Sequence, residues 1–229
     1  GLGITSWQWN FGDGSTSTTQ SPLYVYNTAG TYTVTLTVAN DGGANTNVKT
    51  NYITVSPAPP ANIIKLYPGW NFVSVPKRLA SGHNTAFQVF GGVNLGGHAI
   101  LLWDAQNGMW KQVMAGDTLQ PLNGYWVYSV TRVDVPLTFD TVTPPAPYPK
   151  QLYAGWNAVG YAGTTSMSAH NFLTIMGGLD GNWGTLLGYH EGNNPDSPII
   201  RDSNDGLPMY PTKGYWISMN NNDTLTVVV

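Results

Sequence analysis

The first sixty residues alternate between apolar and polar positions with a period of two, which is typical of half-buried β-strands. Trp7 and Trp9 occupy alternate positions before the turn-forming sequence FGDG. In GTYTVTLTVAN, residues 30–40, one aromatic and three aliphatic residues face one side while threonines face the other. DGGAN then predicts a hairpin turn and NVKTNYITV a returning strand. We therefore expect an antiparallel sheet in this part of the chain.

Beyond residue 60, the sequence contains a duplication. KLYPGWNFVSV at 65 returns as QLYAGWNAVGY at 151, AFQVFGGV at 86 as NFLTIMGGL at 171, ILLW at 100 as TLLG at 185, and NGYWVYS at 123 as KGYWISM at 213. Blocks that recur in the same order predict two homologous modules, at 61–142 and 148–229. Proline-rich segments at 57–62 and 143–150 indicate short extended linkers.

Each module is expected to contain short strands and one short helix. Asn84 or Ser168 is placed to cap that helix, and a Gly-Gly pair follows it. We expect Gly91 and Gly177, the first glycine of each pair, to end the helices in the left-handed conformation. The predicted fold class is all-β over the whole chain.

Composition narrows the classes of function. Only 9% of the 229 residues are charged, the net charge is −3, and no cysteine is present. Without a basic stripe we expect no nucleic-acid partner, and without a run of eighteen apolar residues we expect no membrane insertion. No leader precedes Gly1, so we expect any export signal to be absent from this sequence. A surface made polar by hydroxyls and amides favours an extracellular or cell-surface location.

Residues 4–55 resemble a known family. WQWNFGDGS, then SPLYVYNTAGTYTVTLTVAND, then YITV resemble the PKD (polycystic kidney disease) domain. The resemblance implies an immunoglobulin-like β-sandwich at 1–56, truncated because the family has two further strands before the tryptophan strand. The GWN and GYW modules resemble those of modular surface proteins of archaea and bacteria, a resemblance that implies no defined activity.

An incomplete sandwich exposes an apolar face and one unpaired row of backbone groups. We expect β-strand complementation to cover them, either by an upstream fragment or by another copy of the chain. The apolar strand DTLTVVV at the end of the sequence is the preferred donor. The expected assembly interface therefore consists of Trp7, Trp9, Leu225, Val227 and Val229.

Catalytic and metal-binding motifs are not evident. The four histidines, His83, His98, His170 and His190, are scattered, and no nucleophile motif, phosphate loop or dinucleotide fingerprint occurs. We therefore predict no catalytic residue, no cofactor and no metal site. The acidic stretch 191–205 leaves calcium binding open, but it lacks the spacing of known calcium loops and favours a solvated loop. Its acidic residues are Glu191, Asp196, Asp202 and Asp205.

The tryptophans of the two modules fall into two groups, those that the duplication matches and those that it does not. Trp70, Trp126, Trp156 and Trp216 occupy matched positions in both modules, which favours core packing. Trp103, Trp110 and Trp183 are unmatched, so they are the candidates for exposed rings that stack on a ligand such as a glycan. Asn222 begins an N-x-T triplet and is a candidate glycosylation site.

Two functions follow as hypotheses. The modular order and the incomplete sandwich favour an extracellular structural or adhesive surface protein, such as a filament or surface-layer subunit. The alternative is a carbohydrate-binding accessory region of a secreted hydrolase, because PKD domains often occur beside such enzymes. An enzyme in its own right is the least favoured class, since no acid, base or nucleophile arrangement is present.

Overall fold

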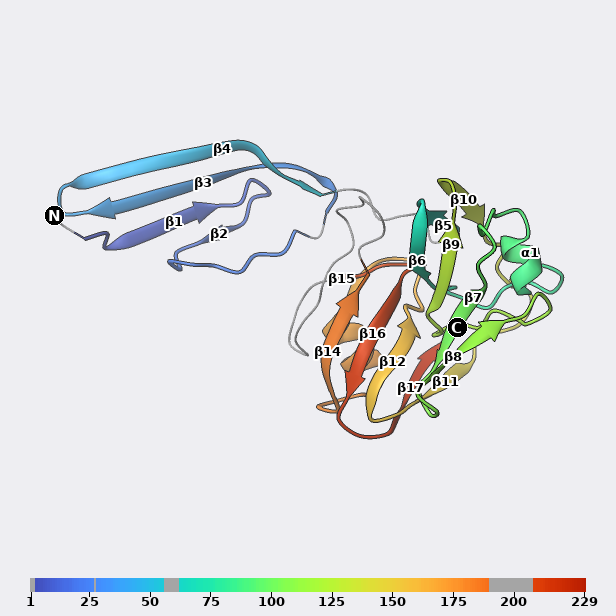
Figure 1. Ribbon diagram of the computed structural model, residues 1–229. Coiled ribbons are helices and arrows are strands. Elements are labelled where there is room, and N and C mark those ends of the chain that lie inside the picture. Colours follow the sequence, from blue (N-terminus) through green and yellow to red (C-terminus); the bar gives the residue numbers. More distant parts are fainter. Residues whose placement is uncertain (1–2, 27, 56–61, 190–207) are drawn as a thin grey trace. The chain divides into compact units, whose positions relative to one another are not determined.

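A computed structural model describes residues 3–26, 28–55, 62–189 and 208–229. The chain divides into two compact units, Gly1–Pro57 and Ala58–Val229 (Figure 1). Both units are built from antiparallel strands, with one short helix in each half of the second unit. The predicted all-β fold class is therefore confirmed.

Unit 1 contains one four-stranded sheet among its described residues, in the order β2-β1-β3-β4. Trp9 lies opposite Leu36, and Trp7 lies opposite Val38. Because opposed residues share a face, both indoles and the apolar side chains of β3 line one side of the sheet. Both tryptophans are half-buried on this face. The strands are β1 (Ser6–Asn10), β2 (Thr16–Ser17), β3 (Gly30–Asn40) and β4 (Gly43–Val55).

An aromatic cluster closes one end of this sheet. Phe11 is buried and stacks on Tyr24 with ring centroids 3.8 Å apart. The Tyr24 hydroxyl donates to the Asp13 carboxylate at 2.5 Å, and the Ser15 N–H donates to it at 3.0 Å. These two hydrogen bonds, the first above all, hold the pKa of Asp13 below its usual range. The FGDG turn thus uses its acid to fix the turn, as expected for an aspartate in that position.

The first half of unit 2 contains a four-stranded sheet, a two-stranded sheet and helix α1. The larger sheet has the order β6-β9-β7-β8, and the smaller pairs β10 with β5. The elements are β5 (Ile63–Leu66), β6 (Gly69–Val73), α1 (Ala86–Phe90), β7 (Ile100–Asp104), β8 (Met109–Val113), β9 (Tyr125–Ser129) and β10 (Val133–Pro136).

The second half follows the same plan. Its sheet has the order β12-β16-β14, and β11 pairs with β17 as β5 pairs with β10. A π-helix, η1, stands where α1 stands in the first half. The elements are β11 (Pro147–Leu152), β12 (Gly155–Gly160), β13 (Met167–Ser168), η1 (His170–Met176), β14 (Trp183–Gly188), β15 (Pro208–Met209), β16 (Gly214–Met219) and β17 (Asp223–Val228).

Matched side chains make matched hydrogen bonds in the two halves. The Asn71 amide accepts from the Tyr67 N–H at 2.8 Å, and Asn157 accepts from the Tyr153 N–H at 2.9 Å. Each asparagine also donates to two carbonyls of the same turn. These buried amides therefore fix the sharp connection that leads into each GWN strand, and they support the proposed duplication.

The two halves contact each other reciprocally, as expected for pseudo-twofold related copies. The Ser74 N–H donates to the Thr212 carbonyl at 2.9 Å, and the Gly160 N–H donates to the Leu122 carbonyl, also at 2.9 Å. Ser74 aligns with Gly160 in the duplicated sequence, and Leu122 aligns with Thr212. Leu122 and Thr212 have φ of 62° and 63°, a left-handed conformation that few residues adopt. The shared backbone strain therefore lies where the halves meet.

Each half has its own apolar core, but the cores are linked. Leu122, from the first half, is fully buried among residues of the second, including Val159 and Tyr215. The first core gathers around Ile64, Leu66 and Val127. Unit 2 is therefore one compact body built from two similar halves.

The helix ends correct two expectations from the sequence. Thr85, rather than Asn84, caps α1, because its side chain and that of Gln88 form a capping box. Gly91 and Gly177 follow their helices with φ of −62° and −87°, so neither adopts the expected left-handed conformation. Glycine is needed at both positions because no side chain would fit. A Cβ at Gly91 would lie 2.4 Å from the Phe87 carbonyl oxygen, and one at Gly177 would lie 2.3 Å from the Leu225 side chain.

Candidate functional site

Four tryptophans of unit 2, Trp103, Trp110, Trp156 and Trp216, form what we call the tryptophan surface. Trp103 on β7 lies directly opposite Trp110 on β8, so both rings face the same side of their sheet. On β12 and β16, Trp216 lies opposite Ala158 and Trp156 lies opposite Ser218, which gives those two indoles a common face as well. The sheets of both halves therefore contribute to this surface.

Three of these rings form a triangle. The ring centroids are 5.1 Å apart for Trp103 and Trp110, 5.8 Å for Trp103 and Trp216, and 5.8 Å for Trp110 and Trp216. All three pairs are edge-to-face, the arrangement that the charge distribution of aromatic rings favours. The Trp103 indole N–H donates to the Trp156 carbonyl at 3.0 Å, which joins the two halves at the surface.

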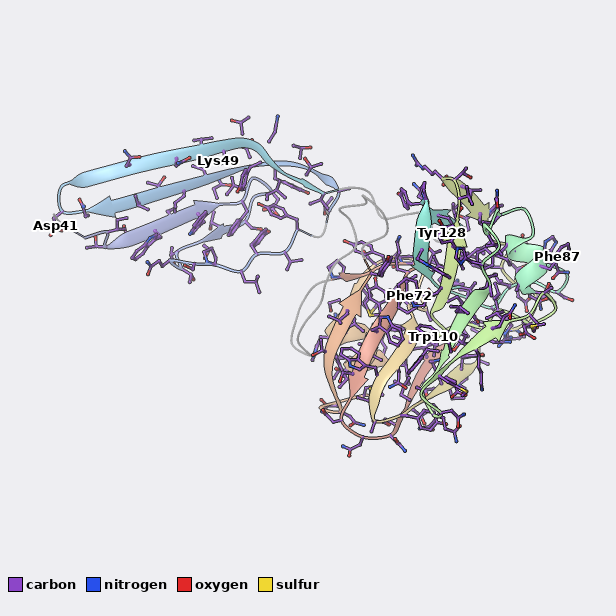
Figure 2. The ribbon with its side chains drawn as sticks, in the orientation of Figure 1. Asp41, Lys49, Phe72, Phe87, Trp110 and Tyr128 are labelled. Atoms are coloured by element: carbon purple, nitrogen blue, oxygen red, sulfur yellow. The ribbon has the colours of Figure 1, made fainter. Side chains whose placement is uncertain are left out.

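Two of the indoles are available to a ligand. Trp110 is 46% exposed and Trp156 is 45% exposed, whereas Trp103 and Trp216 are half-buried. Trp110 lies on β8, an edge strand of its sheet, whereas Phe72 on β6 is buried; both are labelled in Figure 2. An exposed ring that packs on further rings, as Trp110 packs on Trp103 and Trp216, is preorganised to stack on an apolar or sugar-like face.

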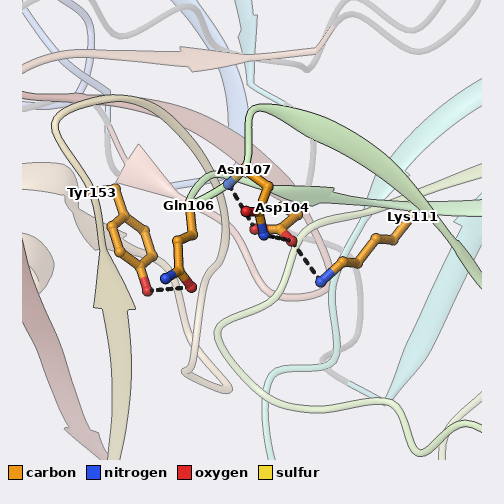
Figure 3. Close-up of polar contacts among 5 residues, drawn as sticks. All are labelled: Asp104, Gln106, Asn107, Lys111 and Tyr153. Carbon is orange, nitrogen blue, oxygen red and sulfur yellow. Dashed lines mark hydrogen bonds and ion pairs between the residues drawn. The ribbon is translucent and has the colours of Figure 1, made fainter.

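Polar side chains gather at the β7–β8 turn (Figure 3). The Asp104 carboxylate pairs with the Lys111 ammonium at 2.5 Å and accepts from the Asn107 amide at 2.8 Å. The hydrogen bond from Lys111, followed by that from Asn107, lowers the pKa of Asp104 to about 2. Asp104 is therefore ionised at any physiological pH and holds the hairpin tip in one geometry.

A cleft of about 240 Å³ lies next to these groups, between the β7–β8 hairpin and the strands β11 and β12. Across it, the Tyr153 hydroxyl donates to the Gln106 side-chain oxygen at 3.0 Å, which connects the two halves again. The cleft offers an aromatic wall and several hydrogen-bonding side chains, which suits a small polar ligand with an apolar face. Its lining includes Trp103, Asp104, Gln106, Lys111, Gln151 and Tyr153.

The three sequence-predicted ligand-binding tryptophans are separated by the fold. Trp103 and Trp110 lie together in the tryptophan surface. Trp183 does not: it is 2% exposed, packs in the second core, and donates its indole N–H to the Thr174 hydroxyl at 3.1 Å. The expectation of an exposed ring at Trp183 was therefore wrong, because β14 turns this residue towards the core.

The matched tryptophans also depart from the expected core packing. Trp156 is exposed. Trp126 stacks on the buried Phe72, with the two ring centroids 4.9 Å apart. The Trp126 indole N–H is buried and has no hydrogen-bond partner among the described residues. Duplication of a tryptophan therefore did not predict burial, because the two GWN strands lie in different surroundings.

The expected assembly residues occupy two very different environments. Trp7 and Trp9 line the half-buried face of unit 1. Leu225 and Val227, in contrast, are buried in the second core of unit 2, and their strand β17 pairs with β11 along its whole length. Val229 exchanges two backbone hydrogen bonds of 3.2 Å with Ala146. The C-terminal strand is needed in its own half, which contradicts our expectation that it is donated to another chain.

Two further predictions concern polar segments. Asn222 is exposed in the turn before β17, and its side-chain oxygen accepts from the Ala154 N–H at 2.9 Å. Its glycosylation stays a prediction. The acidic stretch 191–205 lies outside the described residues.

Within the described ranges, no group of three or more histidine or acidic residues is arranged to hold a metal ion. In the same ranges, no helix has the length and apolar character needed to cross a membrane.

Comparisons with known proteins concern unit 1. Residues 1–55 match the PKD domain family and form a PKD domain. The chain is 46% identical over 56 residues to Collagenase ColA of Bacillus cereus, an alignment that covers 24% of this chain and 6% of the collagenase. It is 52% identical over 40 residues to Pre-pro-metalloprotease PrtV of Vibrio cholerae, covering 18% of this chain and 4% of the protease. No solved structure matches.

The similarity spans only a small part of the relatives, 4% to 6% of their length. The PKD resemblance inferred from FGDG and the following strand pattern is confirmed. The tryptophan surface and the cleft lie outside the residues matched to the PKD family. The sequence did not predict the Asp104 network or the exposure of Trp156. The match between the two GWN motifs wrongly favoured core packing for Trp156.

Proposed function

We propose that this chain is a non-catalytic extracellular region that accompanies a hydrolase and binds carbohydrate through its tryptophan surface. The observation that carries the proposal is the pair of exposed indoles, Trp110 and Trp156, on the tryptophan surface of unit 2. Sugar rings present an apolar face of C–H groups and an edge of hydroxyls. The exposed indoles suit the former.

The comparisons support the accessory role. The PKD domain of unit 1 is shared with a collagenase and a metalloprotease, and it is one small part of each. A region that contains a PKD domain and a ligand-binding unit would position a separate catalytic domain on its target. The extracellular location is proposed on the same grounds and on the low content of charged residues.

Retention of the full chain on immobilised polysaccharides and on a glycan array tests this proposal. We expect Trp110→Ala to weaken binding about tenfold or more, because an aromatic stacking partner contributes on the order of 1–3 kcal/mol. Phe87→Ala is the matched control: Phe87 is also exposed, but it projects from α1 at another part of unit 2 (Figure 2). Absence of glycan binding, or equal binding by both variants, would contradict the proposal.

A second function is favoured by unit 1. Its apolar face carries two half-buried indoles, and β4 has no neighbouring strand on its outer edge among the described residues. Ten consecutive residues of β4, Gly43 to Tyr52, are exposed. A long exposed edge favours addition of a strand from an upstream fragment or another copy, as in an adhesive protein, a filament or a surface layer. We keep this as the alternative proposal.

A further inference from the structure

Lys150 and Asn123 make an unusual contact between the two halves of unit 2. The Lys150 ammonium nitrogen lies 2.5 Å from the side-chain oxygen of Asn123. Lys150 is on β11, the first strand of the second half, and Asn123 directly precedes Gly124 and β9 in the first half. The contact therefore joins two segments that are 27 residues apart in the chain.

The amine of Lys150 lacks a counter-charge. Among the described residues, Asn123 is the one group that accepts a hydrogen bond from it, and it is a neutral amide. Burial lowers the pKa of Lys150 to about 8. A desolvated lysine of this kind supplies a substantial fraction of neutral amine near physiological pH, and neutral amines are nucleophiles.

The amide nitrogen of Asn123 contacts a phenol. It donates to the Tyr125 hydroxyl at 3.3 Å, and that hydroxyl also accepts from the Gln120 N–H at 2.7 Å and donates to the Gln120 carbonyl at 3.4 Å. Burial raises the pKa of Tyr125 to about 12, so the phenol keeps its proton. The side-chain amide is thus held between a nucleophile and a weak acid.

We propose that Lys150 and Asn123 form an intramolecular isopeptide bond that covalently joins the two halves of unit 2. The side-chain nitrogen of Lys150 attacks the side-chain carbonyl carbon of Asn123, and a C–N bond forms. The C–N bond to the original amide nitrogen breaks, and that nitrogen leaves as ammonia. The leaving nitrogen gains one proton from the Tyr125 hydroxyl, while the attacking nitrogen loses one and restores the phenol. Atoms, charge and electrons therefore balance without an oxidant, reductant or cofactor.

Proximity makes such a reaction feasible without an external catalyst. Reacting groups held in contact behave as if they were present at a very high effective concentration, up to about 10⁵ M or more in favourable cases. Lys150 and Asn123 are both partly buried, which limits the access of water as a competing nucleophile. A bond here would close a loop across the proline-rich segment 143–150 and restrict the unfolded chain.

Intact mass spectrometry of the denatured full chain tests the proposal. After incubation at pH 9 and 37 °C, where the Lys150 amine is mostly neutral, we expect the mass to fall by one ammonia, about 17 Da. Trypsin should no longer cleave after Lys150, and a branched peptide should link residues 112–132 to residues 133–201. An unchanged mass with normal cleavage after Lys150 would overturn the proposal.

Two controls separate the isopeptide bond from succinimide formation, which also releases ammonia at Asn-Gly sequences such as 123–124 and 107–108. Lys150→Met removes the nucleophile but leaves both Asn-Gly sites, so a loss that persists in this variant comes from succinimide. Lys65→Met, which removes a lysine from β5, should leave the branched peptide intact. The test does not depend on the folding of Lys150→Met, because the branched peptide is sought in the unaltered chain. If that peptide is absent after incubation, the proposal is overturned.

Discussion

Asp104 shows how one residue links the fold to the candidate site. Its carboxylate is held by Lys111 and Asn107, and this network fixes the hairpin that carries Trp110. No sequence pattern predicts this network, because Asp104 and Lys111 come into contact only once β7 and β8 have paired. The sequence could propose Trp103 and Trp110 as ligand-binding residues since both are unmatched aromatics, and that role stays a prediction, whereas the Asp104 network depended on the turn geometry.

The Asp104 carboxyl should titrate at about pH 2 rather than near the ordinary aspartate value of 3.8, because Lys111 and Asn107 favour its ionised form. A pKa lowered in the folded state contributes stability above the unfolded value, and that contribution is lost as the pH falls from about 4 to about 2. Nuclear magnetic resonance of the side-chain carboxyl measures the pKa directly. Lys111→Met should raise it towards 3.8, and an unaltered titration in this variant would show that the ion pair is not the main cause.

The elements were largely predictable, and the errors have local causes. Period-two alternation identified β1, β3 and β4, and the repeated blocks identified the strands that recur in the two halves. The strand β17 was predicted but misassigned to assembly, because the alternation in DTLTVVV does not reveal that β11 is its partner. Gly-Gly pairs marked both helix ends, but they did not reveal that the first glycine is needed for space rather than for a left-handed backbone.

The glycines after η1 provide a test at the scale of an element. A Cβ at Gly177 would lie 2.3 Å from Leu225 and within 3 Å of two carbonyl oxygens of η1, so we expect Gly177→Ala to destabilise unit 2 by about 2–4 kcal/mol. Gly178→Ala is the matched control, because Gly178 has open space but a φ of 79°, and its replacement should cost only about 1 kcal/mol. Chemical denaturation measures both values, and an equal loss in the two variants would refute the packing explanation.

At the scale of the whole molecule, the sequence predicted the boundary near residue 57 but not the way in which the two halves of unit 2 combine. The repeated blocks imply two modules, yet they do not show that Leu122 enters the other core or that the halves exchange backbone hydrogen bonds. Such contacts depend on packing between segments far apart in the chain. The tryptophan surface is a product of this combination, since each half supplies part of it.

The alternative role in assembly is tested by the exposed edge strand of unit 1. If β4 adds a strand from another copy, the full chain should form dimers or larger species in light-scattering measurements. Val48→Asp should reduce their size, because a charge in the middle of an edge strand opposes pairing. Ile175→Asp, at an exposed site of η1, is the control and should have no effect. A chain that stays monomeric at every concentration would exclude assembly through this edge.

The triangle of Trp103, Trp110 and Trp216 also has a spectroscopic consequence. Indole transition dipoles whose rings are within about 6 Å couple strongly, so the three chromophores should produce an exciton couplet in circular dichroism and share their excitation energy. A sugar that covers Trp110 would perturb the emission of all three. The intrinsic fluorescence of unit 2 would then report occupancy of the tryptophan surface without any attached dye.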